Sequence, residues 1–178
     1  MRLFYTGASI KNGTQENPLQ SLGGFLSSTV VPNNRKGSTF PDLDLLDLDK
    51  DIEHVMCFIL KNETTQSIQD VKIYSELIQG QRAKYELAAV TVNGNGSVER
   101  VNDLKSSPYV GTFFDISGIA EEVTLVSTLV EGGMIGLWIR RKIDKIDKKT
   151  CKDLYEDYKN KVSLDEEFEK FKLVINFT

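Results

Sequence analysis

The segment IEHVMCFILKNE, residues 52–63, decides the fold class of this chain. From Val55 onward its side chains are apolar on both faces and rich in Val, Ile and Phe, which is typical of a central strand in a packed sheet. A second long segment, GMIGLWIRRKI at residues 133–143, also has strand character, with Trp138 as its core or interface anchor. Both segments predict a β-rich domain.

Shorter segments with strand patterns surround these two, and turn signals separate them. In residues 70–77 the side chains alternate, so that Val71, Ile73 and Ser75 face one side. The other expected strands are 1–6, 84–92, 109–116 and 168–178, and the NGNG at 93–96 is the clearest hairpin signal, with residues 97–101 pairing back. These features predict an all-β, mainly antiparallel fold, an immunoglobulin-like β-sandwich of about seven or eight strands.

One segment breaks the β pattern. In DKKTCKDLYEDYKNK, residues 147–161, an apolar stripe recurs with helical spacing. The residues of this stripe are Cys151, Leu154, Tyr155 and Tyr158. We therefore expect one helix, inserted near the C-terminus between the last two strands.

The N-terminal region has a different composition. Residues 7–41 carry three of the four prolines, much Gly, Ser, Thr and Asn, and no sustained apolar period. This predicts a long extended arm, so that residues 1–50 hold one strand and the arm and residues 51–178 hold the sandwich. Apolar side chains interrupt the arm, and such side chains need a surface on which to be buried. We expect them to dock on the arm's own domain or, by preference, on a neighbouring subunit.

The residues expected to make subunit contacts come from the arm and from the 133–143 strand. They are Leu22, Phe25, Leu26, Val30, Val31, Arg35, Trp138, Arg140 and Arg141.

Charge is unevenly spread along the chain, whose net charge is −4. Residues 42–53 contain six acids and one Lys, whereas residues 138–161 contain nine basic and five acidic residues. The two segments predict two charged poles. Either these are solvated faces, or they match electrostatically between adjacent copies. The overall charge gives no general attraction to nucleic acid, and we expect no direct nucleic-acid contact.

The sequence contains no complete catalytic or metal-binding motif. His54 and Cys57 would point to opposite faces of a strand, so they cannot form a local pair, and we expect His54 at a strand edge or interface. The run Asp47-x-Asp49-x-Asp51 resembles the start of a calcium loop, but Ile52 and Phe58 occupy the positions that need Gly and Glu. We expect no enzymatic activity, no cofactor, no small-molecule substrate and no metal centre. A looser carboxylate site for calcium in the acidic strip stays open.

Four stretches together resemble a known group of proteins. NPLQSLGGFLSSTVVPNNR (residues 17–35) is similar to the N-terminal segment of virion structural proteins of tailed bacteriophages of the crAss-like, Bacteroidales-infecting kind. GLWIRRKID, CKDLYEDYK and KLVINFT resemble the C-terminal half of such proteins. The resemblance implies a neck, connector or tail component, arranged as a ring and assembled into the virion in the bacterial host cytoplasm. It brings no catalytic residues with it.

Two main functional hypotheses follow, and an enzyme with a diffuse carboxylate site is a third. The first is a structural subunit that contacts copies of itself in a ring and also other virion proteins, such as portal, connector or tail components. No contact with a membrane is expected for it. The second is a β-sandwich binding module for a glycan or host surface. The binding module predicts a cluster of exposed aromatic side chains, for which Tyr74, Tyr85 and Tyr109 are the candidates.

Overall fold

The computed structural model contains ten β-strands and one short 3-10 helix among the residues that it describes. Those residues are 1–7, 13–32, 40–41, 48–79, 83–116, 122–147, 149–150, 152–153, 156 and 170–178. The elements are β1 (Arg2–Gly7), η1 (Pro18–Gln20), β2 (Gly23–Val30), β3 (Ile52–Lys61), β4 (Ile68–Gln79), β5 (Ala83–Thr91), β6 (Ser97–Arg100), β7 (Phe114–Asp115), β8 (Val123–Leu129), β9 (Met134–Ile143) and β10 (Lys170–Asn176).

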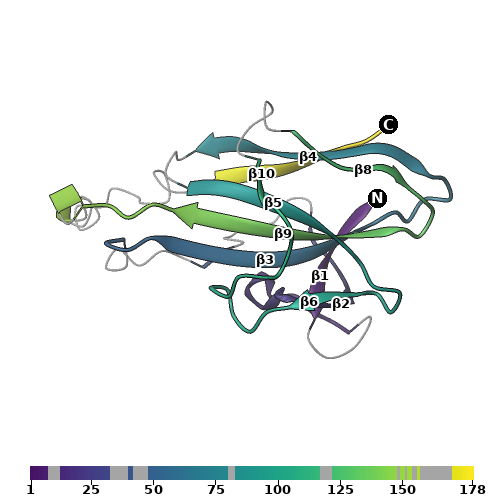
Figure 1. Cartoon of the computed structure of the whole chain (residues 1–178), viewed down its shortest axis with the longest axis horizontal. Coiled ribbons are helices and arrows are strands. Elements are labelled where there is room, and N and C mark those ends of the chain that lie inside the picture. Colours follow the sequence, from purple (N-terminus) through teal and green to yellow (C-terminus); the bar gives the residue numbers. More distant parts are fainter. Residues whose placement is uncertain are drawn as a thin grey trace.

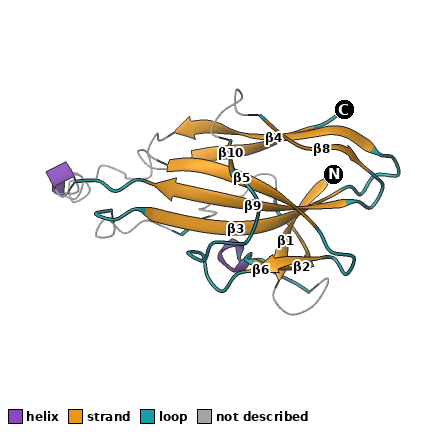
Figure 2. Cartoon of the chain, in the orientation of Figure 1, coloured by secondary structure: helices purple, strands orange, loops and turns teal. Residues whose placement is uncertain are grey.

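The strands form two sheets, and every strand pair is antiparallel. The larger sheet has the order β6-β2-β1-β3-β9-β5-β7, and the smaller has the order β10-β4-β8. In Figure 1 the small sheet lies on one side of β3, β9 and β5, and β1, β2 and β6 lie on the other. Figure 2 shows how strongly strands predominate. The all-β, mainly antiparallel class predicted from the sequence is confirmed.

The pairing of β3 with β9 runs the full length of both strands. Ten residue pairs connect them, from Ile52 opposite Ile143 to Lys61 opposite Met134. The residues from His54 to Leu60 are all buried. The prediction that residues 52–63 contain a central strand is therefore confirmed.

Apolar side chains pack on both faces of this central pair. The first core lies between the two sheets and includes Met56, Phe58, Val71, Ile73, Tyr85, Leu87, Leu137 and Ile139. The second core lies on the opposite face and includes Phe4, Leu22, Leu26, Val55, Cys57, Ile59, Val98, Val101 and Trp138. Val71, Ile73 and Ser75, which were predicted to share one side of residues 70–77, are all fully buried.

The N-terminal region differs from the extended arm expected from its composition. β1 pairs with β3, and β2 pairs with both β1 and β6, so these strands belong to the same sheet as β3. The described part of residues 1–50 is therefore not separated from the domain that follows. Leu22 and Leu26 are buried in this chain's own second core. For residues 18–30, the expectation of an arm that docks on a neighbour is wrong.

Two glycines explain why this strand resembled a linker. Gly23 and Gly24 both have positive φ, at 84° and 92°. A Cβ atom at Gly23 would collide with the carbonyl oxygen of Glu99, and one at Gly24 with that of Gly7. Only glycine combines this backbone conformation with such a close approach of neighbouring chains.

Buried hydroxyl groups attach the N-terminal segment to β3. Ser21 Oγ donates to the carbonyl oxygen of Cys57 at 2.5 Å, and Thr6 Oγ1 donates to the same oxygen at 3.1 Å. The backbone N–H of Cys57 donates to Ser21 O at 2.7 Å. Buried polar groups need such partners, so these Ser and Thr residues fit an interior position.

β6 also pairs differently from the sequence expectation. Gly96 N–H donates to Asn93 O at 2.8 Å, so the NGNG segment does form a tight turn. The strand that follows it nevertheless pairs with β2 and not with β5. Val98 of β6 thereby reaches the second core.

Two polar contacts tie the sheets together at their ends. The Asn62 amide nitrogen donates to the carbonyl oxygens of Gln66, Leu129 and Val130 at 2.8, 3.0 and 3.1 Å. Elsewhere, Ile116 N–H donates to Tyr85 O in the large sheet, while Ile116 O accepts from Ser75 N and Oγ in the small sheet. Of the helix predicted at 147–161, the described residues 149–150, 152–153 and 156 are helical, and the other residues from 148 onward lie outside the described part of the chain.

Asn62 is the side chain on which we expect the connections between β3 and β4 and between β8 and β9 to depend. An Asn62→Ala variant should lose roughly 2 to 4 kcal/mol of unfolding free energy, because three carbonyl oxygens each lose one hydrogen bond. Urea unfolding measures this change. The control is Asn102→Ala at an exposed position, where we expect less than about 0.5 kcal/mol. Equal effects of the two substitutions would contradict this role.

Candidate functional site

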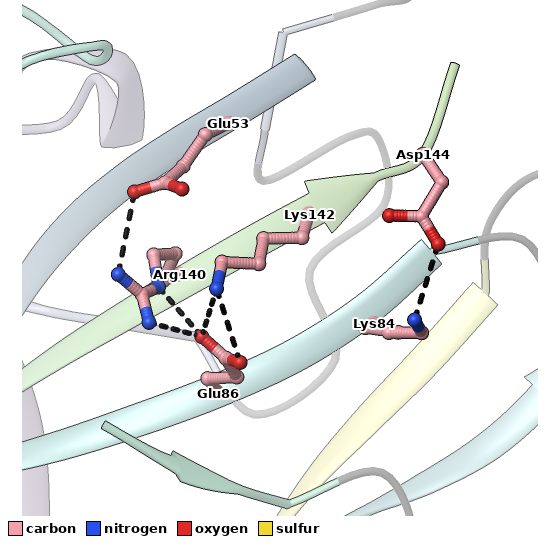
Figure 3. Close-up of polar contacts among 6 residues, drawn as sticks. All are labelled: Glu53, Lys84, Glu86, Arg140, Lys142 and Asp144. Atoms are coloured by element: carbon pink, nitrogen blue, oxygen red, sulfur yellow. Dashed lines mark hydrogen bonds and ion pairs between the residues drawn. The ribbon is translucent and has the colours of Figure 1, made fainter. Parts of the chain in front are cut away.

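A network of charged side chains crosses β3, β9 and β5 on one face of the large sheet (Figure 3). Arg140 Nε donates to Glu86 Oε2 at 2.6 Å, and Arg140 Nη2 contacts the same oxygen. Arg140 Nη1 lies 3.4 Å from Glu53 Oε1, and Lys142 Nζ lies 3.2 Å from Glu86 Oε2. Glu86 thus binds two cations while Arg140 binds two carboxylates.

The antiparallel register produces this network. Glu86 lies opposite Arg140 across the β5–β9 pair, and Glu53 lies opposite Lys142 across the β3–β9 pair. The network lies on the same face as Trp138, because alternate residues of a strand share a face. The Arg140 side chain is only 16% exposed, so its ion pairs are less screened by water than those at the surface. The neighbouring Lys84–Asp144 pair, at 3.1 Å, is largely exposed.

Arg140 also holds the segment between β6 and β7 in place. Its guanidinium carbon lies 3.9 Å from the centre of the Phe113 ring, within the range of a cation–π contact. The same segment is bonded to β3, because Val55 N–H donates to Leu104 O at 2.7 Å. These two contacts fix the position of the loop between β6 and β7 relative to the large sheet.

The loop held in this way presents an aromatic side chain to solvent. Tyr109 is 96% exposed, whereas the preceding Pro108 is buried. Val110 N–H donates to Pro108 O at 2.9 Å, so the chain turns tightly at Tyr109. Phe114, five residues further on, is 51% exposed on β7, the last strand of the large sheet.

The expectation of two separate charged poles is wrong for the described residues. Pairing of β3 with β9 brings Glu53 opposite Lys142. In addition, Asp51 Oδ1 accepts from the backbone N–H of Lys145 at 2.9 Å. Opposite charges from the two segments therefore lie beside each other within one chain. Residues 42–47 of the acidic strip lie outside the described residues, and so does the cation site left open there.

Arg141 lies on the opposite face from Arg140 and is completely buried. Its Nη2 donates to Pro41 O and to His54 Nδ1, both at 2.8 Å. Its guanidinium carbon lies 5.0 Å from the centre of the Phe40 ring. Arg141 therefore attaches residues 40–41 to the end of the first core. It makes an internal contact and not the subunit contact that we expected.

His54 is buried beside Arg141, in contrast to the strand-edge or interface position expected for it. Burial first, and then the positive charges of Arg141 and Lys105, lower the pKa of His54 to about 4. At neutral pH the ring is uncharged, so Nδ1 can accept the proton of the arginine. Cys57 packs in the second core, and burial raises the pKa of its thiol well above the usual value. The two residues thus lie on opposite faces, as their spacing predicted.

The other expected contact residues have different surroundings. Trp138 is fully buried in the second core, which makes it a core residue and not an interface anchor. Phe25, Val30 and Val31 are half-buried, and Arg35 lies outside the described residues. Of the expected contact residues, only Arg140 belongs to the charged network. Its partners Glu53 and Glu86 were missed because they are distant in sequence and carry no local signal.

The aromatic cluster expected of a glycan-binding face is not found among the candidates. Tyr74 and Tyr85 are buried, at 8% and 1% exposure. Only Tyr109 of the three is available to a ligand.

Neither a family model, nor a curated protein, nor a solved structure matches this chain. The described residues contain no group of three or more His, Cys, Asp or Glu placed to hold a metal ion. Nor do they include a helix with the length and apolarity needed to cross a membrane.

His54 should make stability depend on pH. Between pH 6.5 and 4 the unfolded chain binds a proton at this residue that the folded chain does not, so stability falls as the pH falls. Relative to a His54→Gln variant, which keeps an acceptor for Arg141, the wild type should lose roughly 3 kcal/mol from pH 7 to 4. Urea unfolding at several pH values measures the difference, in which shared carboxylate effects cancel. A difference that does not change with pH would contradict the assignment.

Proposed function

We propose that this chain is a non-enzymatic structural subunit of a tailed-phage particle, forming part of a ring in the neck, connector or tail. The sequence resemblance of residues 17–35 and of the C-terminal half supports this proposal. We further propose that the two packed sheets form an immunoglobulin-like sandwich with the inserted helix expected at 147–161. Copies of the chain and other virion proteins, such as portal, connector or tail components, would be its partners in the virion.

The proposed contacts differ from those first expected, because Leu22 and Leu26 are used within the chain's own core. The observation that carries the revised proposal is the exposure of Tyr109 and Phe114. Of the four large hydrophobic side chains exposed among the described residues, these two lie within six residues of each other in sequence. Aromatic side chains are enriched at protein interfaces and often dominate their binding energy.

The charged network supports a binding role for this segment. Arg140 stacks on Phe113, next in sequence to Phe114, and Leu104 is bonded to β3. A loop that is already held in place loses little conformational entropy on binding. A loop of this kind is therefore suited to contacts between subunits that bind one another without changing shape.

The alternative is a binding module for a glycan or host surface, which the single exposed ring of Tyr109 favours. A sugar ring can stack on such an aromatic face. A glycan array would report this activity, and its loss in Tyr109→Ala would assign the site.

A double variant tests the structural role. We expect the purified full chain to form closed rings, visible by native mass spectrometry and negative-stain electron microscopy. The Tyr109→Ala/Phe114→Ala variant should reduce the ring population roughly tenfold or more, since buried aromatic anchors carry much of the interface energy. Its unfolding midpoint should stay close to that of the wild type, because both side chains are exposed.

The matched control is Phe177→Ala, which removes an equally exposed aromatic ring, at 50%, near the end of the small sheet. This control should assemble like the wild type. Rings that persist in the double variant would contradict the proposed contact surface. A chain that stays monomeric and also fails to join purified particles would contradict the structural role itself.

A further inference from the structure

β8 (Val123–Leu129) is an edge strand, and no other described strand pairs with its outer side. It is the last strand of the small sheet, and among the described residues only β4 pairs with it. Apart from this ladder, the one bond that its backbone accepts from the described residues comes from the Asn62 amide to Leu129 O. The outer edge of β8 therefore presents backbone N–H and C=O groups that another strand could pair with.

The composition of β8 differs from that of the other edge strands in the described part of the chain. Its sequence VTLVSTL contains no charged residue and no proline. By contrast, β6 carries Glu99 and Arg100, β10 carries Lys170 and Lys172, and β7 has only two residues. Charges and short length are common means of preventing edge strands from pairing with other chains. β8 has neither, and its one irregularity is a bulge in the ladder to β4.

The sequence of β8 is symmetric in polarity about Val126 except at one pair, Leu125 and Ser127. Val123, Val126 and Leu129 lie opposite Ile73, Val71 and Ile68, which are residues of the first core. Thr124 and Thr128 are exposed. On either side of Val126, Thr124 therefore corresponds to Thr128 and Val123 to Leu129, while Leu125 corresponds to the unlike Ser127.

We propose that β8 pairs with β8 of a second copy of this chain, antiparallel and about a two-fold axis near Val126. This pairing would place Thr124 opposite Thr128 of the other copy, and Val123 opposite Leu129, with each pair occurring twice. A two-fold contact requires such self-complementarity, and an uncharged strand brings no like charges together. The bulge lies in the ladder to β4, between Val126 and Thr124, and adds local twist. In the proposed ladder Leu125 would lie opposite Ser127 of the other copy.

The contact joins the two small sheets into one sheet of six strands. The β8–β8 contact does not depend on the proposed function, because two copies of the chain could pair in this way whether or not they belong to a phage particle. Tyr109 and Phe114 belong to the loop and edge of the other sheet, so the two contacts can be tested separately.

Charge placement at the two threonines tests the register. In Thr124→Lys/Thr128→Lys, lysines would oppose lysines at both pairs, and we expect the dimer dissociation constant to rise at least tenfold. In Thr124→Lys/Thr128→Glu, lysine would oppose glutamate at both pairs, and the dimer should persist. The measurement is sedimentation of the full chain across a concentration series. Both variants change the same two exposed positions, so their unfolding midpoints should agree with each other.

Deuterium exchange of the wild type gives a second readout that needs no variant. The β8 amides should exchange more slowly at a concentration where the dimer forms than at one where it does not. A wild type that is monomeric throughout the series would overturn the proposal. So would a dimer that the two-lysine variant leaves intact, or one that both variants weaken equally.

Discussion

The pairing of β3 with β9 is the interaction on which the rest of the structure depends. Ten residue pairs join two strands that carry apolar side chains on both faces. Such a pair cannot be stable with one face in water, because each buried apolar side chain contributes about 1.5 to 3 kcal/mol. Both faces must be covered. The small sheet covers the first, and β1, β2, β6 and the residues near Val101 cover the second.

This requirement gives the N-terminal region its role. Its apolar side chains Leu22 and Leu26 complete the second core, and its hydroxyl groups bind the backbone of β3 at Cys57. Other polar side chains connect parts of the chain that are distant in sequence. Asn62 bonds the β8 end, Ser75 bonds Ile116, and Arg141 bonds Pro41. Burial without these partners would cost free energy, so each of them favours one arrangement of the chain over its alternatives.

Local patterns were sufficient to predict the central strand and the shared side of Val71, Ile73 and Ser75. Both depend on side-chain periodicity within one segment, which the sequence displays directly. The role of residues 18–30 could not be predicted in this way. Glycine is needed at positions 23 and 24 because the backbones of Glu99 and Gly7 come close to them in the folded chain, and no local pattern shows that approach. The pairing of β6 with β2 was missed for a similar reason. A tight turn between β5 and β6 does not by itself make these two strands pair with each other.

The candidate site was predicted only in part. Arg140 was expected to make a contact, and Tyr109 was among the candidate exposed aromatics. The partners of Arg140 come from β3 and β5, 87 and 54 residues away, so only the fold brings them together. Burial of Trp138 and Arg141 likewise follows from the position of β9 between two strands. A strand's sequence shows that it has two apolar faces, but it does not show which neighbours cover them.

The most direct test is deuterium exchange of the isolated protein at low concentration, resolved along the chain. The amides of β2 should be protected to a similar extent as those of β1, because both strands belong to the sheet built on β3 and β9. If residues 23–30 exchanged at the rate of an unstructured chain while β3 stayed protected, β2 would not belong to this sheet in the isolated protein, and the account would be contradicted. The N-terminal region would then be an arm that only a partner orders, and the second core would not be closed by the chain itself.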